Sequence, residues 1–531
     1  MTSDIISKDW DVIVVGAGIG GGTIGRRLAE RGLSVLFVEK GPSGLAGEQQ
    51  FLRTDLEDPE ARHLRGYWPK PFLATVDGRQ SRFFGPIGSG VGGTSTFYAA
   101  TLERPERHDI DDAADRPHPS GGWPVDYTTF APYYDEAEKL YEVCGERDPL
   151  CDETHQSLRA PPQMSADDRD MAASFRSNGL HPYHVHMAIR AVPGCLQCFG
   201  HKCPKNCKMD GRTAGVEPAL ATGNAALLDM CTVVTICEQG GYVSSIEADW
   251  KGRRISLRAR TYVVAAGGLG SPRLLLASRS PQWPTGLGNR NDLVGRNLMF
   301  HLTEMIAVWP ARGSKSSGPS KSLALRDFYF VDGARYGALQ AMGVDASYGM
   351  IAHYLNGLFD RSAIRHFQTL RQFTRVPAYV AARIFGNAKI FAGIIEDLPY
   401  RHNRVLLDPS DSDQLSFEYT IAAELNERRR EYRGIVRRAL KGHRTVFLTL
   451  QPDLNLAHSC GTLRFGHDPE TSVLDRNCRL HGFRNLYVTD SSFMPSSLGI
   501  NPSLTIAANA LRVGDHILAQ AMHRRLETTD G

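Results

Sequence analysis

Three glycines and one glutamate near the N-terminus stand at regular spacing between apolar runs. The run Asp11–Val15 leads into Gly16-x-Gly18-x-x-Gly21, and Glu39 follows 23 residues after Gly16, just past the apolar stretch 34–38. Such glycines permit a tight turn and let backbone N–H groups approach a pyrophosphate, while the acid accepts hydrogen bonds from a ribose. The pattern predicts a strand, turn, helix and strand that bind a dinucleotide. A glycine turn that serves only packing is the less favoured alternative.

Four cysteines follow one another closely in the middle of the chain, at Cys195, Cys198, Cys203 and Cys207. The spacing C-x2-C-x4-C-x3-C can bring four thiolates onto one loop, which suits an iron–sulfur cluster or zinc, although it is not a full ferredoxin signature. Structural cysteines, reduced or paired in disulfides, are the favoured interpretation. An iron–sulfur cluster comes next and zinc last.

A second glycine-rich stretch, Phe83–Tyr98, has glycine at positions 85, 88, 90, 92 and 93. This density lets a backbone pass close to a flat or charged ligand. The flanking phenylalanines and the hydroxyls of Thr94 and Ser95 favour an ordered loop over a flexible one.

Two further segments place small or polar residues where a strand ends and a helix begins. The apolar strand from Thr261 ends in small residues, and we expect Ser271 to cap the following helix with Pro272 in its first turn. Near the C-terminus, Asp490 ends a strand and Asn501-Pro502 starts a helix. Small residues at the carboxyl end of a strand lie where an open α/β sheet receives its ligand. Because these features lie at both ends of the chain, the first domain should be discontinuous.

The bulk composition excludes some classes of function. A length of 531 residues predicts one large domain or two interlocked ones. A net charge of +3 is too small to argue for a nucleic-acid partner. No stretch reaches the roughly 18 uninterrupted apolar residues of a spanning helix, so no integral membrane segment is expected. The N-terminus has no basic segment followed by an apolar run, which predicts a cytoplasmic protein.

Two arginine-rich stretches, Arg361–Phe385 and Glu424–Lys441, have helical patterns. The first carries its arginines along an apolar run. A helix lying on a membrane surface is one interpretation, and a charged helix face in solvent is the favoured one.

The sequence resembles the glucose-methanol-choline (GMC) oxidoreductase family in several collinear blocks. These are VVGAGIGG with Glu39, the GVGGTS loop at 90–95, GWPVDYTTFAPYYDEAE, AAGGLGSPRLLLAS, His458-x-x-Gly461-Thr462 and LYVTDSSFMPSSLGINPSLTIAANA. They are spread over most of the chain and leave only about 300–450 weakly matched.

The resemblance implies an α/β fold with two parts. The first is a discontinuous Rossmann-like FAD-binding domain made of residues 1–150, 195–300 and 455–531. The second is an α+β substrate-binding domain made of residues 151–194 and 301–454 and built on an antiparallel sheet.

The resemblance also implies that the dinucleotide is FAD, since the glycine fingerprint alone does not distinguish FAD from NAD. The stretch Gly85–Leu102 has no histidine, the residue that usually tethers FAD in this family, so noncovalent FAD is expected. Gln239 would contact the adenine through its backbone, Asp490 the ribityl or pyrophosphate region, and the helix from Pro502 the flavin N1/C2 end. The full set that the resemblance assigns to FAD is Gly16, Gly18, Ile19, Gly20, Gly21, Glu39, Gly92, Gly93, Thr94, Ser95, Gln239, Ala266, Asp490, Pro502 and Ser503.

For catalysis, the family's H-x-x-G-T motif supplies His458, and the polar residue expected some forty positions later is Asn501. The resemblance implies an FAD-dependent alcohol dehydrogenase or oxidase acting on CH–OH donors. His458 would accept the hydroxyl proton as general base while hydride leaves for flavin N5, and Asn501 would orient the substrate oxygen. A flavin-dependent lyase or decarboxylase without net oxidation is the alternative.

The expected partners are a small-molecule alcohol and an electron acceptor, which would be O2, a quinone or a redox protein. A cluster at the four cysteines would pass electrons onward. The sequence does not reveal which alcohol is the substrate.

Overall fold

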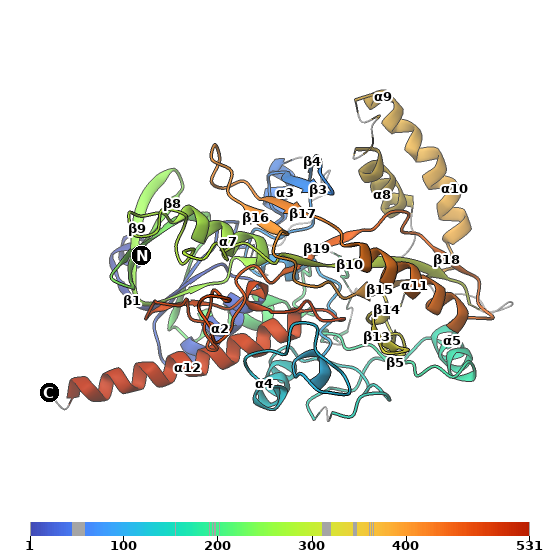
Figure 1. Cartoon of the computed structure of the whole chain (residues 1–531), viewed down its shortest axis with the longest axis horizontal. Coiled ribbons are helices and arrows are strands. Elements are labelled where there is room, and N and C mark those ends of the chain that lie inside the picture. The colour runs from blue at the N-terminus through green and yellow to red at the C-terminus, as the bar shows by residue number, and fades with distance from the viewer. Residues whose placement is uncertain are drawn as a thin grey trace.

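The computed structural model describes residues 2–44, 59–153, 156–190, 192–193, 195, 198–200, 202–310, 320–343, 348–360, 362, 364 and 366–529. The two main sheets lie in neighbouring halves of the molecule along its longest axis, the first of them on the side of the N-terminus (Figure 1). The long helix α12 (Ser503–Thr529) runs along the first sheet's side of the molecule.

The first sheet has seven strands and contains the parallel strands that the fingerprint predicts. Strand β9 is long enough to pair in parallel with β1 and β20 through its second half and antiparallel with β8 through its first half. In spatial order the strands are β6 (Ala225–Leu228), β2 (Val35–Val38), β1 (Asp9–Val15), β9 (Arg253–Val264), β8 (Tyr242–Trp250) and β7 (Cys231–Gln239), with β20 (Leu486–Val488) beside β9.

The second sheet is antiparallel and also has seven strands. It runs in the order β18 (Thr445–Phe447), β10 (Met299–Val308), β15 (Lys389–Ile395), β14 (Leu339–Ala341), β11 (Leu323–Leu325) and β5 (Tyr183–His184), with β19 (Leu454–Cys460) beside β10. Parallel strands with flanking helices at one end and an antiparallel sheet at the other agree with the predicted fold class.

Two smaller sheets complete the strands. One, in the order β16 (Arg404–Leu406), β17 (Ser416–Tyr419), β3 (Phe72–Val76) and β4 (Arg79–Phe83), joins residues 72–83 to residues 404–419. The other pairs β12 (Phe330–Val331) with β13 (Ala334–Arg335). The first of these pairs a segment assigned from the sequence to one domain with a segment assigned to the other. The domain boundaries remain a prediction.

The helices cover both main sheets. The remaining α-helices are α1 (Thr2–Ser7), α2 (Ile19–Glu30), α3 (Pro59–Leu64), α4 (Tyr127–Leu140), α5 (Ala166–Ser177), α6 (Glu217–Ala221), α7 (Gly267–Ala277), α8 (Tyr348–Asp360), α9 (Gln368–Arg371), α10 (Arg375–Phe385) and α11 (Ala423–Ala439). Shorter turns are η2 (Gly93–Phe97), η3 (Arg107–Asp109), η4 (Gly211–Val216), η5 (Gln372–Thr374) and η6 (Ser491–Phe493). Among the described residues, no helix combines the length and the apolar character that crossing a bilayer requires.

Helix α7 begins five residues earlier than the sequence predicts. It starts at Gly267, so Ser271 is not its N-cap and Pro272 lies inside it. Proline has no N–H to donate to the carbonyl four residues before it, which here is that of Gly268. The buried Thr462 hydroxyl donates to this oxygen instead, at 2.7 Å. The threonine of the H-x-x-G-T motif therefore completes the hydrogen bonding of a helix whose first turn lines the site described below.

We predict that Thr462→Val destabilises the fold by about 1–3 kcal/mol, because the Gly268 carbonyl loses its donor while it stays buried. The measurement is urea unfolding. Thr471→Val is the matched control, since that hydroxyl is exposed and its bond to Asp468 is long at 3.4 Å. It should change the free energy of unfolding by less than about 0.5 kcal/mol. Equal effects of the two substitutions would contradict this role of Thr462.

Candidate functional site

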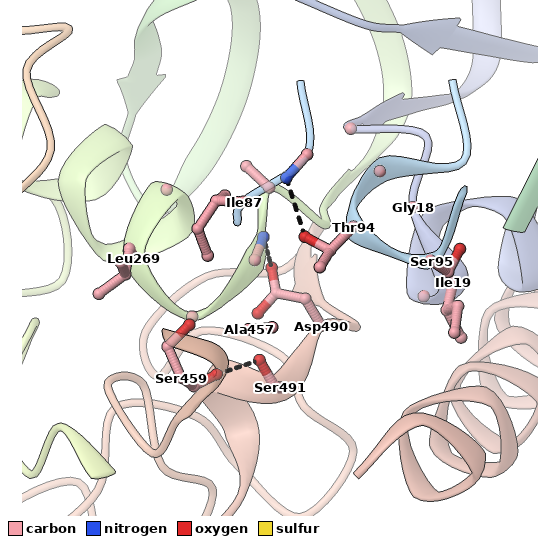
Figure 2. Close-up of a pocket in the computed structure, with 18 of the residues that line it drawn as sticks. Gly18, Ile19, Ile87, Thr94, Ser95, Leu269, Ala457, Ser459, Asp490 and Ser491 are labelled. Carbon is pink, nitrogen blue, oxygen red and sulfur yellow. Dashed lines mark hydrogen bonds between the residues drawn. The ribbon is translucent and has the colours of Figure 1, made fainter. Parts of the chain in front are cut away.

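A cavity of about 350 Å³ lies where the two main sheets meet. Its walls come mainly from four parts of the chain: residues 15–101, residues 231–274, strands β10, β14 and β15, and residues 455–506. Met342 and Leu415 complete the lining. Figure 2 shows Gly18, Ile19 and Ser95 on one side of it and Leu269, Ser459 and Ser491 on the other, with Asp490 between them. The chain therefore brings its N-terminal and C-terminal glycine-rich segments to one place.

The turn between β1 and α2 forms one wall of the cavity, which is lined by residues 16–20. Gly16 has a φ of +98°, and a Cβ there would lie 2.4 Å from the carbonyl oxygen of Ala265. Gly20 would place a Cβ 2.0 Å from the oxygen of Thr489. A Cβ on Gly18, by contrast, would meet only the Cα of Gly93, at 4.0 Å. The first N–H groups of a helix have no partner within it, so the N-terminus of α2 offers an anion site at this wall.

Glu39 lies at the same end of the cavity, directly after β2, and is buried. Its carboxylate accepts hydrogen bonds from the N–H groups of Ala17, at 2.9 Å, and Gly41, at 3.0 Å. Burial raises the pKa of Glu39, and these two N–H groups oppose the rise. Each carboxylate oxygen keeps a lone pair for a further donor such as a ribose hydroxyl.

Asp490 joins three of the cavity's turns. Its carboxylate accepts from the N–H groups of Gly267 and Ser492, both at 2.9 Å, and from the hydroxyls of Ser271 and Ser492. Burial raises its pKa. Asp490 therefore holds the start of α7 against η6, and Ser271, which does not cap α7, serves this contact.

The predicted catalytic histidine, His458, lies in an irregular part of strand β19 and lines the cavity. Strand β10 pairs with β19 at Met299–Cys460 and again at His301–Asn455, so β19 bulges between them. A bulge re-aims side chains. Here it brings Nδ1 of His458 to 2.7 Å from Nδ1 of His301, with the two rings perpendicular.

The hydrogen bonds of His301 determine which nitrogen of His458 carries a proton. Nε2 of His301 lies 3.0 Å from the carbonyl oxygen of Ser497 and 2.7 Å from that of Leu498. Carbonyls only accept, so this nitrogen carries the proton and Nδ1 of a neutral His301 is an acceptor. His458 must then donate from its own Nδ1, which leaves the lone pair of its Nε2 free to accept a proton.

Burial favours the neutral form of both rings. It lowers the pKa of His301, and together with the nearby His301 ring it lowers the pKa of His458 well below the usual value. A neutral His458 with a free Nε2 lone pair is the form that a general base requires.

Asn501 lines the same cavity, and its Oδ1 is buried without a partner in the described structure. Five more polar atoms of cavity residues share this condition: Trp68 Nε1, Ser89 Oγ, Thr101 Oγ1, Arg273 Nε and Thr303 Oγ1. Buried polar groups without partners cost free energy, so a cavity with six of them is suited to a ligand that has many polar atoms. Together with the glycine turn and Glu39, they fit a dinucleotide.

Most of the predicted site residues line this one cavity. The set comprises Gly16, Gly18, Ile19, Gly20, Glu39, Gly93, Thr94, Ser95, Ala266, His458, Asp490, Asn501, Pro502 and Ser503. Their individual contacts with FAD remain a prediction.

Three predicted positions lie away from the cavity. Gln239 is exposed at the far end of β7, opposite Tyr242, whereas Thr232 and Val233 at the other end of that strand line the cavity. The predicted contact of Gln239 with the adenine was therefore wrong, because Gln239 lies at the opposite end of β7 from the residues that line the cavity. Gly21 packs α2 against the turn, since a Cβ there would lie 2.0 Å from the oxygen of Gly16, and Gly92 faces Thr96 and Arg212.

The four clustered cysteines interact with one another through their side chains. Within the described part of the chain, no group of three or more Cys, His, Asp or Glu side chains could hold a metal ion. Cys203 and Cys207 are buried, Cys195 and Cys198 are half-buried, and all four are free thiols. The iron–sulfur alternative, which spacing alone suggested, has no support in this geometry.

Two further residues of the site were missed from the sequence. His301 lies 157 residues from His458 in a segment with no motif, and only the pairing of β10 with β19 brings the two together. The side-chain amide nitrogen of Asn455, which also lines the cavity, lies 3.3 Å from the same Nδ1 of His458. Because that Nδ1 carries a proton, the amide can bond to it only when turned to present its oxygen. Its position three residues before His458 is the one signal that could have indicated it.

Comparison with known proteins gives consistent matches. Residues 10–303 and 399–510 match two family models, each described as GMC oxidoreductase. The 6'''-hydroxyparomomycin C oxidase of Streptomyces lividus is 29% identical over 96% of this chain and 92% of its own. The 2-methyl-1,2-propanediol dehydrogenase of Mycolicibacterium austroafricanum is 28% identical over 96% of this chain and 95% of its own. The crystal structure of pyridoxine 4-oxidase from Mesorbium loti has a similar fold, with a TM-score of 0.61 at 20% identity, over 96% of this chain and 99% of that one.

We predict that Gly18→Ala leaves the fold intact but weakens flavin binding at least tenfold, because the new Cβ has room in the protein and projects toward the cavity. The ratio of flavin to protein absorbance and a flavin titration measure the effect. Gly434→Ala is the control, since that glycine lies in α11 with only the end of Arg438 near its Cβ position. Full flavin affinity in Gly18→Ala would contradict the prediction that the turn between β1 and α2 binds the cofactor.

Proposed function

Because this chain belongs to the GMC oxidoreductase family, we propose that it is an FAD-dependent enzyme that oxidises the CH–OH group of a small-molecule alcohol to a carbonyl. The observation that carries the proposal is the neutral His458, with its Nε2 lone pair free, in the cavity that is also lined by the glycine turn between β1 and α2.

Oxidation of an alcohol removes a hydride from carbon and a proton from oxygen. When bound, FAD supplies the acceptor for the hydride at its N5 position. His458 Nε2 accepts the hydroxyl proton, and the Nδ1–H of the same ring stays bonded to His301. The resulting imidazolium is flanked by the Asn455 amide, which also lines the cavity.

Asn501 is proposed to position the substrate. It lies two residues before the start of α12, and its buried Oδ1 has no partner within the described structure, so it is available to a substrate hydroxyl. An amide does not compete for the proton that His458 takes, because it does not titrate in this range. Helix α12 starts at the same cavity, which Pro502 and Ser503 line, and its first free N–H groups would stabilise negative charge that develops there.

The names of the relatives bear on the substrate and the acceptor. Oxidases and dehydrogenases occur among them, and the substrates in their names include 6'''-hydroxyparomomycin C and 2-methyl-1,2-propanediol. We therefore propose a polyhydroxylated or otherwise polar alcohol as substrate. The electron acceptor, predicted from the sequence to be O2, a quinone or a redox protein, would be identified by following reoxidation of the reduced enzyme with each. A cytoplasmic location also remains a prediction.

We predict that His458→Ala retains FAD yet lowers the rate of flavin reduction by alcohol at least 100-fold, through loss of the general base. Anaerobic stopped-flow absorbance measures this rate across a panel of alcohols. His467→Ala is the matched control, because that histidine is exposed and lies outside the cavity. Near-normal reduction in His458→Ala would contradict the assignment. Turnover of a substrate without any flavin reduction would favour a lyase of the same fold.

We further predict that His301 acts by positioning His458. His301→Leu removes the acceptor for Nδ1–H, so the tautomer that cannot accept a proton at Nε2 becomes populated, and kcat should fall about 10–100-fold. His301→Gln provides a carbonyl oxygen in its place and should recover most of that loss. In the wild type, kcat/KM should stay constant as pH falls to about 6.5 and decline only below it, because the pKa of His458 is lowered.

Equal rates in His301→Leu and wild type, or a His301→Gln enzyme no better than His301→Leu, would contradict the positioning role. A decline of wild-type kcat/KM that begins well above pH 6.5 would contradict a His458 that stays neutral by burial.

A further inference from the structure

A helical hairpin projects from the second sheet. The chain leaves that sheet at the end of β14 and returns at the start of β15, and these two strands pair directly. Between them lie α8, α9, η5 and α10, which stand out from the body in Figure 1. The Thr374 hydroxyl bonds to Asn356 of α8 at 2.7 Å, and Phe385 packs on Trp309 at the base.

This hairpin exposes an unusual number of large apolar side chains. Fourteen such side chains are exposed among the described residues, and eight of them fall between positions 364 and 384: Ile364, Phe367, Leu370, Phe373, Val376, Tyr379, Val380 and Ile384. Phe373 is 68% exposed and Val376 is 65% exposed. Isolated exposed apolar residues are ordinary, but a contiguous set marks an interaction surface.

Four of these apolar residues form one stripe along η5 and α10. Phe373, Val376, Val380 and Ile384 recur every three or four residues, so they share a face, while Ala378 on the other side is the buried residue of this helix. A helix in solvent would carry polar residues on that outer face. The sequence-based preference for a charged, solvated face does not account for this stripe.

The charge of the segment has a single sign. Residues 361–388 contain five arginines and one histidine and neither aspartate nor glutamate. Arg375 and Arg383 are exposed, and the Arg383 guanidinium lies 5.0 Å from the centre of the Tyr379 ring. Arginine-rich α11 differs, because its Arg429 is buried against Glu304 and its Arg428 pairs with Glu424.

We propose that the face formed by Phe373, Val376, Val380 and Ile384, flanked by Arg375 and Arg383, docks the enzyme on a membrane surface that contains acidic phospholipids. Apolar side chains of an interfacial helix enter the boundary between headgroups and acyl chains, and arginines beside them bind lipid phosphates. Aromatic residues such as Tyr379 favour the same boundary. A neutral or cationic partner surface would not match the charge of this segment.

Docking would place the catalytic cavity at the membrane. Strands β14 and β15, which hold the two ends of the hairpin, contribute Gln340, Ala392 and Ile394 to the cavity wall. The proposal does not depend on which alcohol is oxidised or on the role of His458.

Co-sedimentation of the flavin-loaded enzyme with vesicles tests the proposal. One vesicle preparation is phosphatidylcholine alone, and the other is an equimolar mixture of phosphatidylcholine and phosphatidylglycerol. The enzyme should bind the anionic vesicles, and raising the salt concentration should weaken binding. A triple variant, Phe373→Ser with Val376→Ser and Val380→Ser, and a double variant, Arg375→Glu with Arg383→Glu, should each lower vesicle affinity at least tenfold.

The matched control is Arg430→Glu with Arg438→Glu, which makes the same change of charge at exposed positions of α11. It should keep most of the affinity, and all variants should keep their flavin. Failure of the wild type to bind anionic vesicles, or equal binding by the variants, would overturn the proposal. So would light scattering in which the triple variant converts a dimer to a monomer while vesicle binding is unchanged, since the stripe would then cover a second copy of the chain.

Discussion

Two backbone carbonyls determine the chemistry of this site. The oxygens of Ser497 and Leu498 fix the proton of His301 on Nε2, and His301 in turn fixes the proton of His458 on Nδ1. Leu498 has a φ of +66°, which is strained for a leucine. The loop is held there because the Tyr329 hydroxyl accepts from the Gly499 N–H at 2.6 Å and the Asp397 carbonyl accepts from the Ser497 hydroxyl at 2.9 Å.

The two halves of the fold supply different parts of the site. The first sheet and its helices present the glycine turn, Glu39 and the start of α7, which suit a dinucleotide. The second sheet supplies His301 on β10, and the bulge in β19 turns His458 toward it. Asp490 and Thr462 connect the two, since both bond to the first turn of α7. The segments proposed to bind the cofactor and the proposed base, His458, are therefore parts of one hydrogen-bonded framework.

The local sequence pattern was sufficient to predict the glycine turn proposed to bind the dinucleotide. It was insufficient to predict the hydrogen bond between His301 and His458. Gly16, Gly18 and Glu39 could be identified because their spacing within one strand–turn–helix unit reflects the geometry directly. His301 could not, because its role comes from strand pairing across 157 residues. Gln239 was misplaced because a strand's sequence does not show which of its ends faces a ligand. The cysteine spacing left a cluster and structural thiols open, and in the described part of the chain no group of three or more Cys, His, Asp or Glu side chains could hold a metal ion. The pattern of Arg361–Phe385 favours a solvated charged face because charge is visible in a sequence and exposure is not.

The central claim is that His458 is neutral, carries its proton on Nδ1 and offers Nε2 to the substrate. Nitrogen-15 spectra of the flavin-loaded enzyme with labelled histidine, assigned by substitution of single histidines, report this directly. The account predicts a neutral His458 protonated at Nδ1 and a neutral His301 protonated at Nε2 near pH 7. A His458 protonated at Nε2, or a His458 imidazolium at that pH, would contradict it.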